Sequence, residues 1–242
     1  MTLESWPATA DLLEAFSADM LAAGGTVVDT YHDGVRLFAR ATLPALREVR
    51  PGDGLRGGVA VRATAEELRV HPYVFRLVCS NGAISARAIQ SWRIERDDLA
   101  ADPDRSADDV LAEFREAVRA CSADEAFASA AEGMRSATFT AADQFVNVLP
   151  MLSQVMRHLS PKQAGQAIEQ ILGRFERDGD RSRFGLMNAV TATARDTRDP
   201  DLRWRLEEFG GGIPSLAVPA DRGPRGPAAA ACRSAEMAGA MG

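Results

Sequence analysis

The sequence is poor in several residue types, and each shortage excludes a class of protein. Its three cysteines, Cys79, Cys121 and Cys232, are odd in number and far apart in the 242-residue chain. That pattern indicates reduced thiols rather than a disulfide framework, so we expect a cytoplasmic protein. The three histidines are also scattered, and no Cys-x-x-Cys or His-x-x-x-His spacing occurs, so we expect no bound metal. Only one of the 28 basic residues is a lysine, which indicates the codon usage of a GC-rich genome and not a particular chemistry.

Long apolar runs are missing as well. No stretch approaches the roughly 20 apolar residues that a membrane-spanning helix needs, so we expect no membrane association. The first residues are acidic and lack a basic n-region, so we expect no signal peptide. Apolar content is 46% and charged content 26%, which are ordinary values for a globular chain. A chain of this length buries enough apolar surface to fold without a metal or a cofactor, and we expect neither.

No linear signature of catalysis is present either. Gly52, Gly54 and Gly57 superficially match a dinucleotide-binding fingerprint, but they precede an expected strand instead of following one. A Walker-type Gly-Lys-Ser/Thr is absent. Cys79 ends an apolar, strand-like run, so we predict a buried and unreactive thiol. We therefore assign no catalytic residue, and the sequence favours a non-enzymatic protein.

Charge is distributed unevenly along the chain. Residues 35–96 contain eleven arginines and five acidic residues, a net charge of +6; the whole chain carries −6, so the rest sums to −12. A basic segment beside acidic helices is one sign of an anionic partner. The alternative is that exposed strand positions need polar residues and that this genome supplies arginine. The acidic pI of about 5.2 argues against a nucleic-acid partner, because such domains are commonly basic.

The first 96 residues are predicted to form a helix followed by strands. Apolar residues recur at helical spacing over residues 8–23. Strands are expected over 26–32 and 35–43, joined by Asp33-Gly34, a pair typical of a tight hairpin. In the second of these strands one face is apolar and the other mostly polar. Leu43-Pro44 is expected to end that strand, because proline cannot donate to a ladder. Further strands are expected over 58–63 and 68–79, with Asn81-Gly82 as the exit turn.

Residues 97–212 are predicted to be helical beyond an acidic linker at 97–104. Ser106 is the expected N-cap of a helix that ends at Cys121. Further helices are expected over 123–135, 140–159, 160–177, 182–198 and 200–209, with a kink at Pro150. Residues 213–242 are rich in proline, glycine and alanine, so we expect a disordered tail. The predicted fold class is α+β: an antiparallel sheet of about four strands within residues 1–96, packed with helices from that region and from 97–212 of the same domain.

Two stretches carry a family resemblance. The first combines a Gly52-Asp53 turn, the apolar pair Gly58-Val59 and the run Tyr73–Gly82, which reads YVFRLVCSNG. The second is Arg183–Asp196, which contains Asn-Ala-Val-Thr. Together they resemble the phage- and plasmid-like family known as domain of unknown function 932 (DUF932), over roughly residues 35–213. The chain departs from the family pattern at Ala63–Glu66, where Asn-Ser-Glu is expected. The resemblance implies a mobile-element protein, but the family carries no settled activity.

These observations favour a non-enzymatic phage- or plasmid-like protein that binds single-stranded DNA or assists DNA metabolism. The candidate nucleic-acid-binding residues are Arg36, Arg40 and Arg62, which lie on expected strands at spacings that share a face. Arg76 has apolar neighbours and is instead expected to form a structural salt bridge. The alternatives are a structural, oligomeric interaction protein and, last, an enzyme whose site no linear motif reveals. We also expect a homo-oligomer.

Two further features bear on a DNA-binding role. Aromatic side chains on the sheet would stack bases, and the candidates are Tyr31, Phe38, Tyr73 and Trp92. The Asn81-Gly82 pair has two interpretations. One is a tight turn that needs positive φ, and the other is a backbone anion site beside Arg76 and Arg87.

Overall fold

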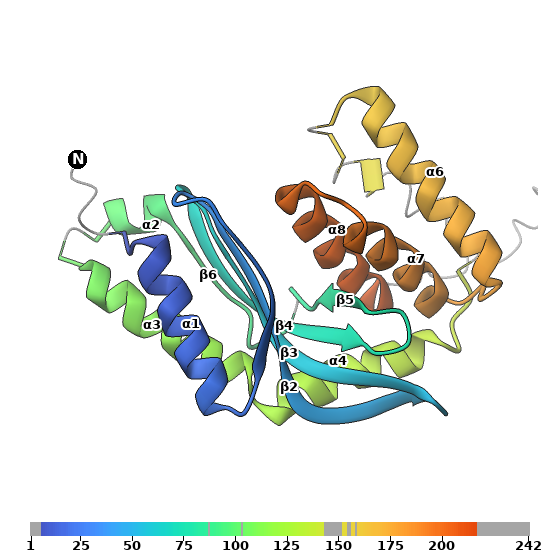
Figure 1. The fold of residues 1–242 in the computed structure, drawn as a ribbon, viewed down its shortest axis with the longest axis horizontal. Coiled ribbons are helices and arrows are strands. Elements are labelled where there is room, and N and C mark those ends of the chain that lie inside the picture. The colour runs from blue at the N-terminus through green and yellow to red at the C-terminus, as the bar shows by residue number, and fades with distance from the viewer. Residues whose placement is uncertain are drawn as a thin grey trace, which may run out of the picture.

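A six-stranded antiparallel sheet forms the middle layer of the protein, and helices cover both of its faces (Figure 1). The computed structural model describes residues 6–86, 88–102, 104–142, 152–153, 156–157 and 159–216. The strands are β1 (Thr26–His32), β2 (Leu37–Arg50), β3 (Asp53–Ala63), β4 (Glu67–Arg76), β5 (Asn81–Ile84) and β6 (Trp92–Glu95). They follow the order β1-β2-β3-β4-β5, and β6 pairs with the first half of β4. The expected α+β class with an antiparallel sheet in the N-terminal half is confirmed, and the four expected strands correspond to the four long ones.

The β1–β2 hairpin forms at the expected position. Gly34 takes a φ of +87°, which is the left-handed conformation that favours glycine. The carboxylate of Asp33 accepts hydrogen bonds from the backbone N–H groups of Val35 and Arg36. A glycine and an aspartate therefore both stabilise the turn, one through its backbone and the other through its side chain.

β2 does not end at Pro44, as the sequence predicted. The strand continues to Arg50, and its pairing with β3 shifts register between Thr42 and Leu46. Pro44 therefore lies in a β-bulge, where its missing N–H costs no ladder hydrogen bond. A bulge is the usual way for a strand to accept a proline without ending.

β4 changes its outer partner in the middle. Residues 67–70 pair with β6 and residues 73–76 pair with β5, which leaves His71 and Pro72 between the two partners. The disruption expected at Pro72 is therefore the point on β4 where its outer neighbour changes from β6 to β5. The exit turn, however, was predicted wrongly: residues 77–80 form the turn, and Asn81-Gly82 begins β5. Ser80, not Gly82, takes the positive φ of 50°.

The helices are close to the expected ranges. They are α1 (Thr9–Ala22), α2 (Arg96–Ala100), α3 (Ala107–Cys121), α4 (Asp124–Ala137), α6 (Pro161–Asp178), α7 (Arg183–Arg195) and α8 (Pro200–Gly212), with a 3-10 turn, η2 (Ile213–Ser215). Ser106 caps α3 as predicted, and its hydroxyl accepts a hydrogen bond from the N–H of Asp109. Ser160 and Ser182 cap α6 and α7 in the same way. The acidic linker expected at 97–104 instead begins within the short helix α2.

Alternating side chains of the sheet pack into different layers. Ala39, Val59 and Val61 belong to a core that includes residues of α1 and α3. Phe38 and Tyr73 point the other way and pack against Trp204 of α8. Both faces of the central strands are therefore buried, whereas the sequence predicted one buried and one mostly polar face. A larger core joins the ends of β2–β5 to α4, α6, α7 and α8.

Two of the sequence predictions fall largely outside the described residues. They are the helix at 140–159 with its kink at Pro150, and most of the tail at 213–242. Ile213 is described and is buried in the large core, so the ordered part of the chain extends beyond α8.

Candidate functional site

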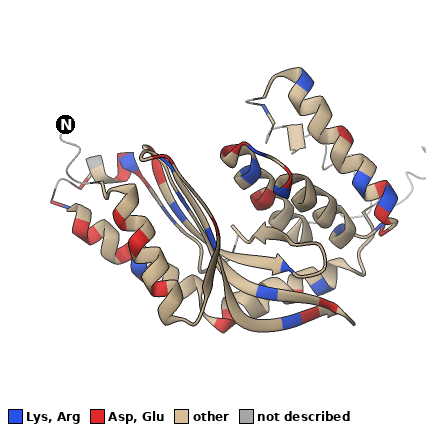
Figure 2. Ribbon diagram, viewed as in Figure 1, with Lys and Arg blue, Asp and Glu red and all other residues tan. Residues whose placement is uncertain are grey.

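α8 covers the face of the sheet that carries the arginines. In Figure 2 charged residues of both signs lie on the sheet and on α8, whereas acidic residues predominate on α1 and α3. Asp201 pairs with both Arg36 and Arg62, at 3.0 and 2.8 Å. Glu208 pairs with Arg69 at 3.0 Å. α8 therefore supplies carboxylates to the basic strands from within the chain.

The most deeply buried of these ion pairs joins Arg40 to Glu207. The Nε of Arg40 donates to Oε2 of Glu207 over 2.6 Å, and the two side chains are only 2% and 1% exposed. Asp29 and Arg203 complete the group: Asp29 pairs with Arg40 at 2.9 Å and with Arg203 at 3.0 Å, and Arg203 also pairs with Glu207. Burial raises the pKa of Glu207, and the two guanidinium groups oppose that rise. Burial acts to lower the pKa of Arg40, but Glu207, Tyr73 and Asp29 together outweigh it and the pKa is raised, so Arg40 stays charged.

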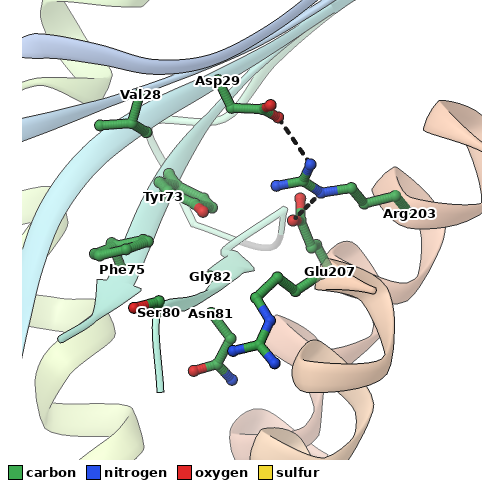
Figure 3. A pocket seen from close by; sticks show the side chains of 10 residues that line it. Val28, Asp29, Tyr73, Phe75, Ser80, Asn81, Gly82, Arg203 and Glu207 are labelled. Carbon is green, nitrogen blue, oxygen red and sulfur yellow. Dashed lines mark hydrogen bonds and ion pairs between the residues drawn. The ribbon is translucent and has the colours of Figure 1, made fainter. Parts of the chain in front are cut away.

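A cavity of about 200 Å³ lies beside this group of charges. Its walls come from β1, β4, the turn into β5 with the start of β5, the C-terminal end of α7, and one side of α8 (Figure 3). The lining residues are Val28, Asp29, Tyr73, Phe75, Ser80, Asn81, Gly82, Arg195, Arg203 and Glu207. The sheet contributes the apolar and aromatic wall, and the helices contribute the guanidinium groups (Figure 3).

Tyr73 lies at the inner wall of the cavity. The residue is 2% exposed, and its hydroxyl makes no hydrogen bond to any described residue. Burial raises the pKa of Tyr73, so the phenol is neutral and available as a donor. Gly82 makes room for it, since a Cβ at this position would lie 1.8 Å from the Tyr73 hydroxyl oxygen. The glycine is thus required by close approach and not by its φ.

Two arginines reach the cavity with unused donors. Arg203 donates through Nε to Glu207 and forms an ion pair through Nη1 with Asp29, which leaves Nη2 without a hydrogen bond to the described chain. Arg195 donates through Nε to Asp196 and through Nη1 to the carbonyl of Cys79, and its Nη2 is likewise unused. Two guanidinium groups and a phenol therefore present donors to one small space.

The turn that borders the cavity is strained. Ser80 is the only non-glycine residue with positive φ in the described chain. Such residues cost free energy and persist where the surrounding structure holds them, commonly at binding sites. Asn81 beside it donates to the hydroxyl of Thr191, and its buried Oδ1 has no hydrogen-bond partner in the described chain. The sequence had marked Asn81-Gly82 as a possible anion site, and the pair does line the cavity, but Arg195 and Arg203 supply the cations there.

The three predicted DNA-binding arginines all pair with carboxylates. Arg36 pairs with Asp33 as well as Asp201, and Arg62 pairs with Glu67 as well as Asp201. Arg40 is buried under α8, where no DNA phosphate can reach it without displacing the helix. Arg40 and Arg62 lie on β2 and β3, whereas Arg36 precedes β2 in the hairpin turn and is not a strand residue as predicted. The spacing did not reveal that α8 covers this face.

The other candidate residues have mixed outcomes. Arg76 forms the expected structural salt bridge, with 2.7 Å between its Nη2 and Asp53. Cys79 is only partly buried and lies 3.1 Å from Nη1 of Arg76, so the prediction of a buried thiol was wrong, because the strand ends three residues earlier. Cys121 is the buried thiol, and burial raises its pKa to about 12.

The stacking candidates are mostly internal. Phe38 and Tyr73 are buried, and Tyr31 packs edge-on against Phe38 at 6.0 Å. Trp92 is partly buried.

His71 is buried without a hydrogen bond to the described chain. Its pKa is lowered to about 4, mainly by burial and to a smaller extent by the nearby charges of Arg69 and Arg93. Among the described residues no group of three or more His, Cys, Asp and Glu is arranged to hold a metal.

Two further findings concern membrane helices and similarity to known proteins. None of the helices in the described part of the chain is both long and apolar enough to cross a membrane. No protein-family model, no curated protein and no solved structure matches the sequence or the fold. The function must therefore be argued from the residues of the cavity.

Proposed function

We propose that this protein is a binding module for a small anionic ligand, held in the cavity between β4–β5, the C-terminal end of α7 and one side of α8. The observation that carries the proposal is the convergence of three unused donors on one space: Nη2 of Arg195, Nη2 of Arg203 and the hydroxyl of Tyr73. Charge-assisted hydrogen bonds from guanidinium groups are among the stronger ones in proteins, and they favour carboxylate and phosphate groups.

The carboxylates that line the cavity do not oppose an anion. Glu207 is paired with Arg40 and Arg203, and Asp29 is paired with the same two arginines. Their charge is thus already compensated. Arg195 shares the Asp196 carboxylate with Arg174, so the two arginines together carry one charge more than their partner. The Arg195 side chain is 39% exposed, so an incoming ligand meets it first.

The apolar wall indicates what the anionic group is attached to. Val28, Phe75 and the ring of Tyr73 line the sheet side of the cavity. A flat ring packs well against such a wall, and about 200 Å³ is small compared with the roughly 300–1,000 Å³ of typical ligand sites. We infer a phosphate or carboxylate carried on a small planar body.

The experiment compares ligands and variants by isothermal titration calorimetry. The probes are inorganic phosphate, the four deoxynucleoside monophosphates, benzoate and a short oligothymidylate. Tyr73→Phe removes one unused hydroxyl, and Arg195→Gln removes the exposed cation. Each lost hydrogen bond to a charged group corresponds to about 1.5–3 kcal/mol, so affinity should fall by about tenfold or more.

The matched control is Arg198→Gln, which removes an exposed arginine that does not line the cavity. It should bind as the wild type does. The proposal fails if no probe binds at low salt, or if a probe binds and Tyr73→Phe and Arg195→Gln leave its affinity unchanged.

The prediction of single-stranded DNA binding becomes a special case of this proposal. Because Arg36, Arg40 and Arg62 are engaged with carboxylates, a strand would have to use the cavity for at least one phosphate. Oligothymidylate that binds more tightly than the monophosphate, with affinity that falls steeply with salt, would support it. The predicted self-association needs a different surface, because the cavity offers no area of the size that protein partners bury.

A further inference from the structure

β1 is an open edge of the sheet. It pairs with β2 on one side only, and none of its backbone groups bonds to any other described residue. The strand lacks proline and lysine, which commonly protect such edges, and it exposes Val28 and Tyr31. A row of unpaired N–H and C=O groups beside exposed apolar side chains is a template for another strand.

The opposite edge is protected. β5 is only four residues long and is covered by α7 and α8. The backbone of Ile84 is so close to α8 that a Cβ on Gly211 would lie 2.1 Å from its carbonyl oxygen. β6, which forms the rest of that edge along β4, is also only four residues long. A contact between two β1 strands uses the same edge of both copies, so the pairing ends at two chains.

We propose that two copies of this chain pair antiparallel through β1, with Thr30 on the twofold axis. A bulge at Val28 limits the regular part of the strand to Asp29–His32. Within it Thr30 lies opposite Ala39, whose side chain packs with α1 and α3, and Asp29 and Tyr31 lie opposite Arg40 and Phe38 on the α8 face.

This register matches the faces of the two strands. With Thr30 opposite its own counterpart, Asp29 of each copy lies opposite Tyr31 of the other, so each pair points to the α8 face. Thr–Thr is a favourable cross-strand pair. In a register centred on Asp29, the Asp29 carboxylates of the two copies would face each other. In a register centred between Asp29 and Thr30, Asp29 of one copy would lie opposite Thr30 of the other, and these two side chains point to different faces of the sheet. Thr30 is thus the position at which the strand is complementary to itself.

The pairing also completes the border of the cavity. Val28 and Asp29 line it from β1, so the second copy would place Tyr31 beside Asp29 at its rim. The contact is short: with Thr30 on the axis only residues 28–32 of the two strands overlap, and five residues at about 3.4 Å span roughly 17 Å, which buries less than the roughly 800 Å² per partner of a stable interface. A weak dimer in equilibrium with the monomer follows.

Cross-linking tests the register directly. In a background with Cys79→Ser and Cys232→Ser, Thr30→Cys would place two sulfurs across the axis, where antiparallel Cα atoms are about 4.5–5.5 Å apart and a disulfide forms without strain. Thr26→Cys is the matched control on the same exposed strand, because its counterpart would lie eight residues away along the pair. We expect dimer formation at least about tenfold faster for Thr30→Cys.

Sedimentation velocity over about 5–500 µM then tests the interface without a cross-link. Wild type should shift towards a dimer with concentration, Thr30→Lys should stay monomeric because two like charges would meet on the axis, and Thr26→Lys should behave as wild type. A wild type that is monomeric throughout, equal cross-linking at the two positions, or a dimer that Thr30→Lys leaves intact would each overturn the proposal. Ligand binding to the cavity in a strictly monomeric protein would overturn only this inference.

Discussion

The buried ion pair between Arg40 and Glu207 allows a quantitative test of how α8 is held on the sheet. Four charges, Arg40, Arg203, Asp29 and Glu207, balance one another, and the two central ones are nearly inaccessible to water. Arg40→Met leaves two carboxylates to share Arg203, a net charge of −1 in a group whose Glu207 side chain is only 1% exposed. Breaking one side of a buried pair in this way costs about 3–5 kcal/mol of unfolding free energy. Glu207→Leu leaves the opposite imbalance and should cost a similar amount.

The double variant, Arg40→Met with Glu207→Leu, measures the interaction between the two residues apart from their separate contributions to stability. With both residues replaced, Asp29 and Arg203 still pair at 3.0 Å, so no buried charge is left uncompensated. Apolar replacement of a whole buried pair is often close to neutral, so we expect the double variant within about 2 kcal/mol of wild type. The single costs sum to about 6–10 kcal/mol, so the coupling energy should be at least about 4 kcal/mol.

Urea unfolding followed by far-UV circular dichroism at pH 7 gives these free energies by linear extrapolation. Glu132→Gln is the control, since it removes an exposed ion pair to Arg135 and should change stability by less than about 1 kcal/mol. The reasoning fails if either single variant costs less than about 1 kcal/mol, or if the double variant costs the sum of the two.

Two further outcomes are expected from the same region. The pKa of His71 falls from 6.5 to about 4 in the folded protein, so the unfolded chain takes up the proton first and stability is lost as pH drops from 6.5 towards 4. Between pH 7 and pH 4 wild type should lose about 3 kcal/mol more than His71→Phe, and equal losses in urea titrations would contradict the assignment. Gly82→Ala should destabilise by about 3 kcal/mol because its Cβ meets Tyr73, whereas Gly133→Ala, which meets nothing within 4 Å on α4, should stabilise by about 0.5–1 kcal/mol. The melting temperatures of the two glycine variants, compared with that of wild type, test these expectations. A Gly82→Ala variant as stable as wild type would show that the Tyr73 ring can move away from the added Cβ.

Local patterns predicted most of the secondary structure. Ser106 and the capping residues of α6 and α7 mark helix starts that the structure confirms, because a cap is decided by residues within one turn. The hairpin at Asp33-Gly34 is equally local. Pro44 and Asn81 were misread, since a bulge and a strand start both depend on the neighbouring strands and not on the residue itself.

The candidate site could not be predicted from local patterns. Arg40 reads as an exposed strand residue, and its partner Glu207 is 167 positions away. Tyr73 and Gly82 meet through β4–β5 pairing, and Arg203 joins them only when α8 docks. The one sequence feature that pointed to the cavity was Asn81-Gly82. The pair lines the cavity, but its sequence is equally typical of an ordinary tight turn. Charge counting detected the basic strands correctly, but it could not show that their anionic partner was α8.

The distance in sequence between the strands and α8 has a consequence for synthesis on the ribosome. The chain emerges from its N-terminus, so the hairpins of residues 26–76 can form well before Asp201 and Glu207 have been made. During that interval Arg36, Arg40 and Arg62 have only the local carboxylates of Asp33, Asp29 and Glu67, and the second carboxylate that α8 gives each of them is missing. The arginine-bearing face of the nascent sheet is then less fully neutralised while it lies beside ribosomal RNA. Chains that terminate early, before about residue 200, would keep that face permanently. Shortened chains should thus bind polyanions, for example on a heparin column, more strongly than the full-length protein does.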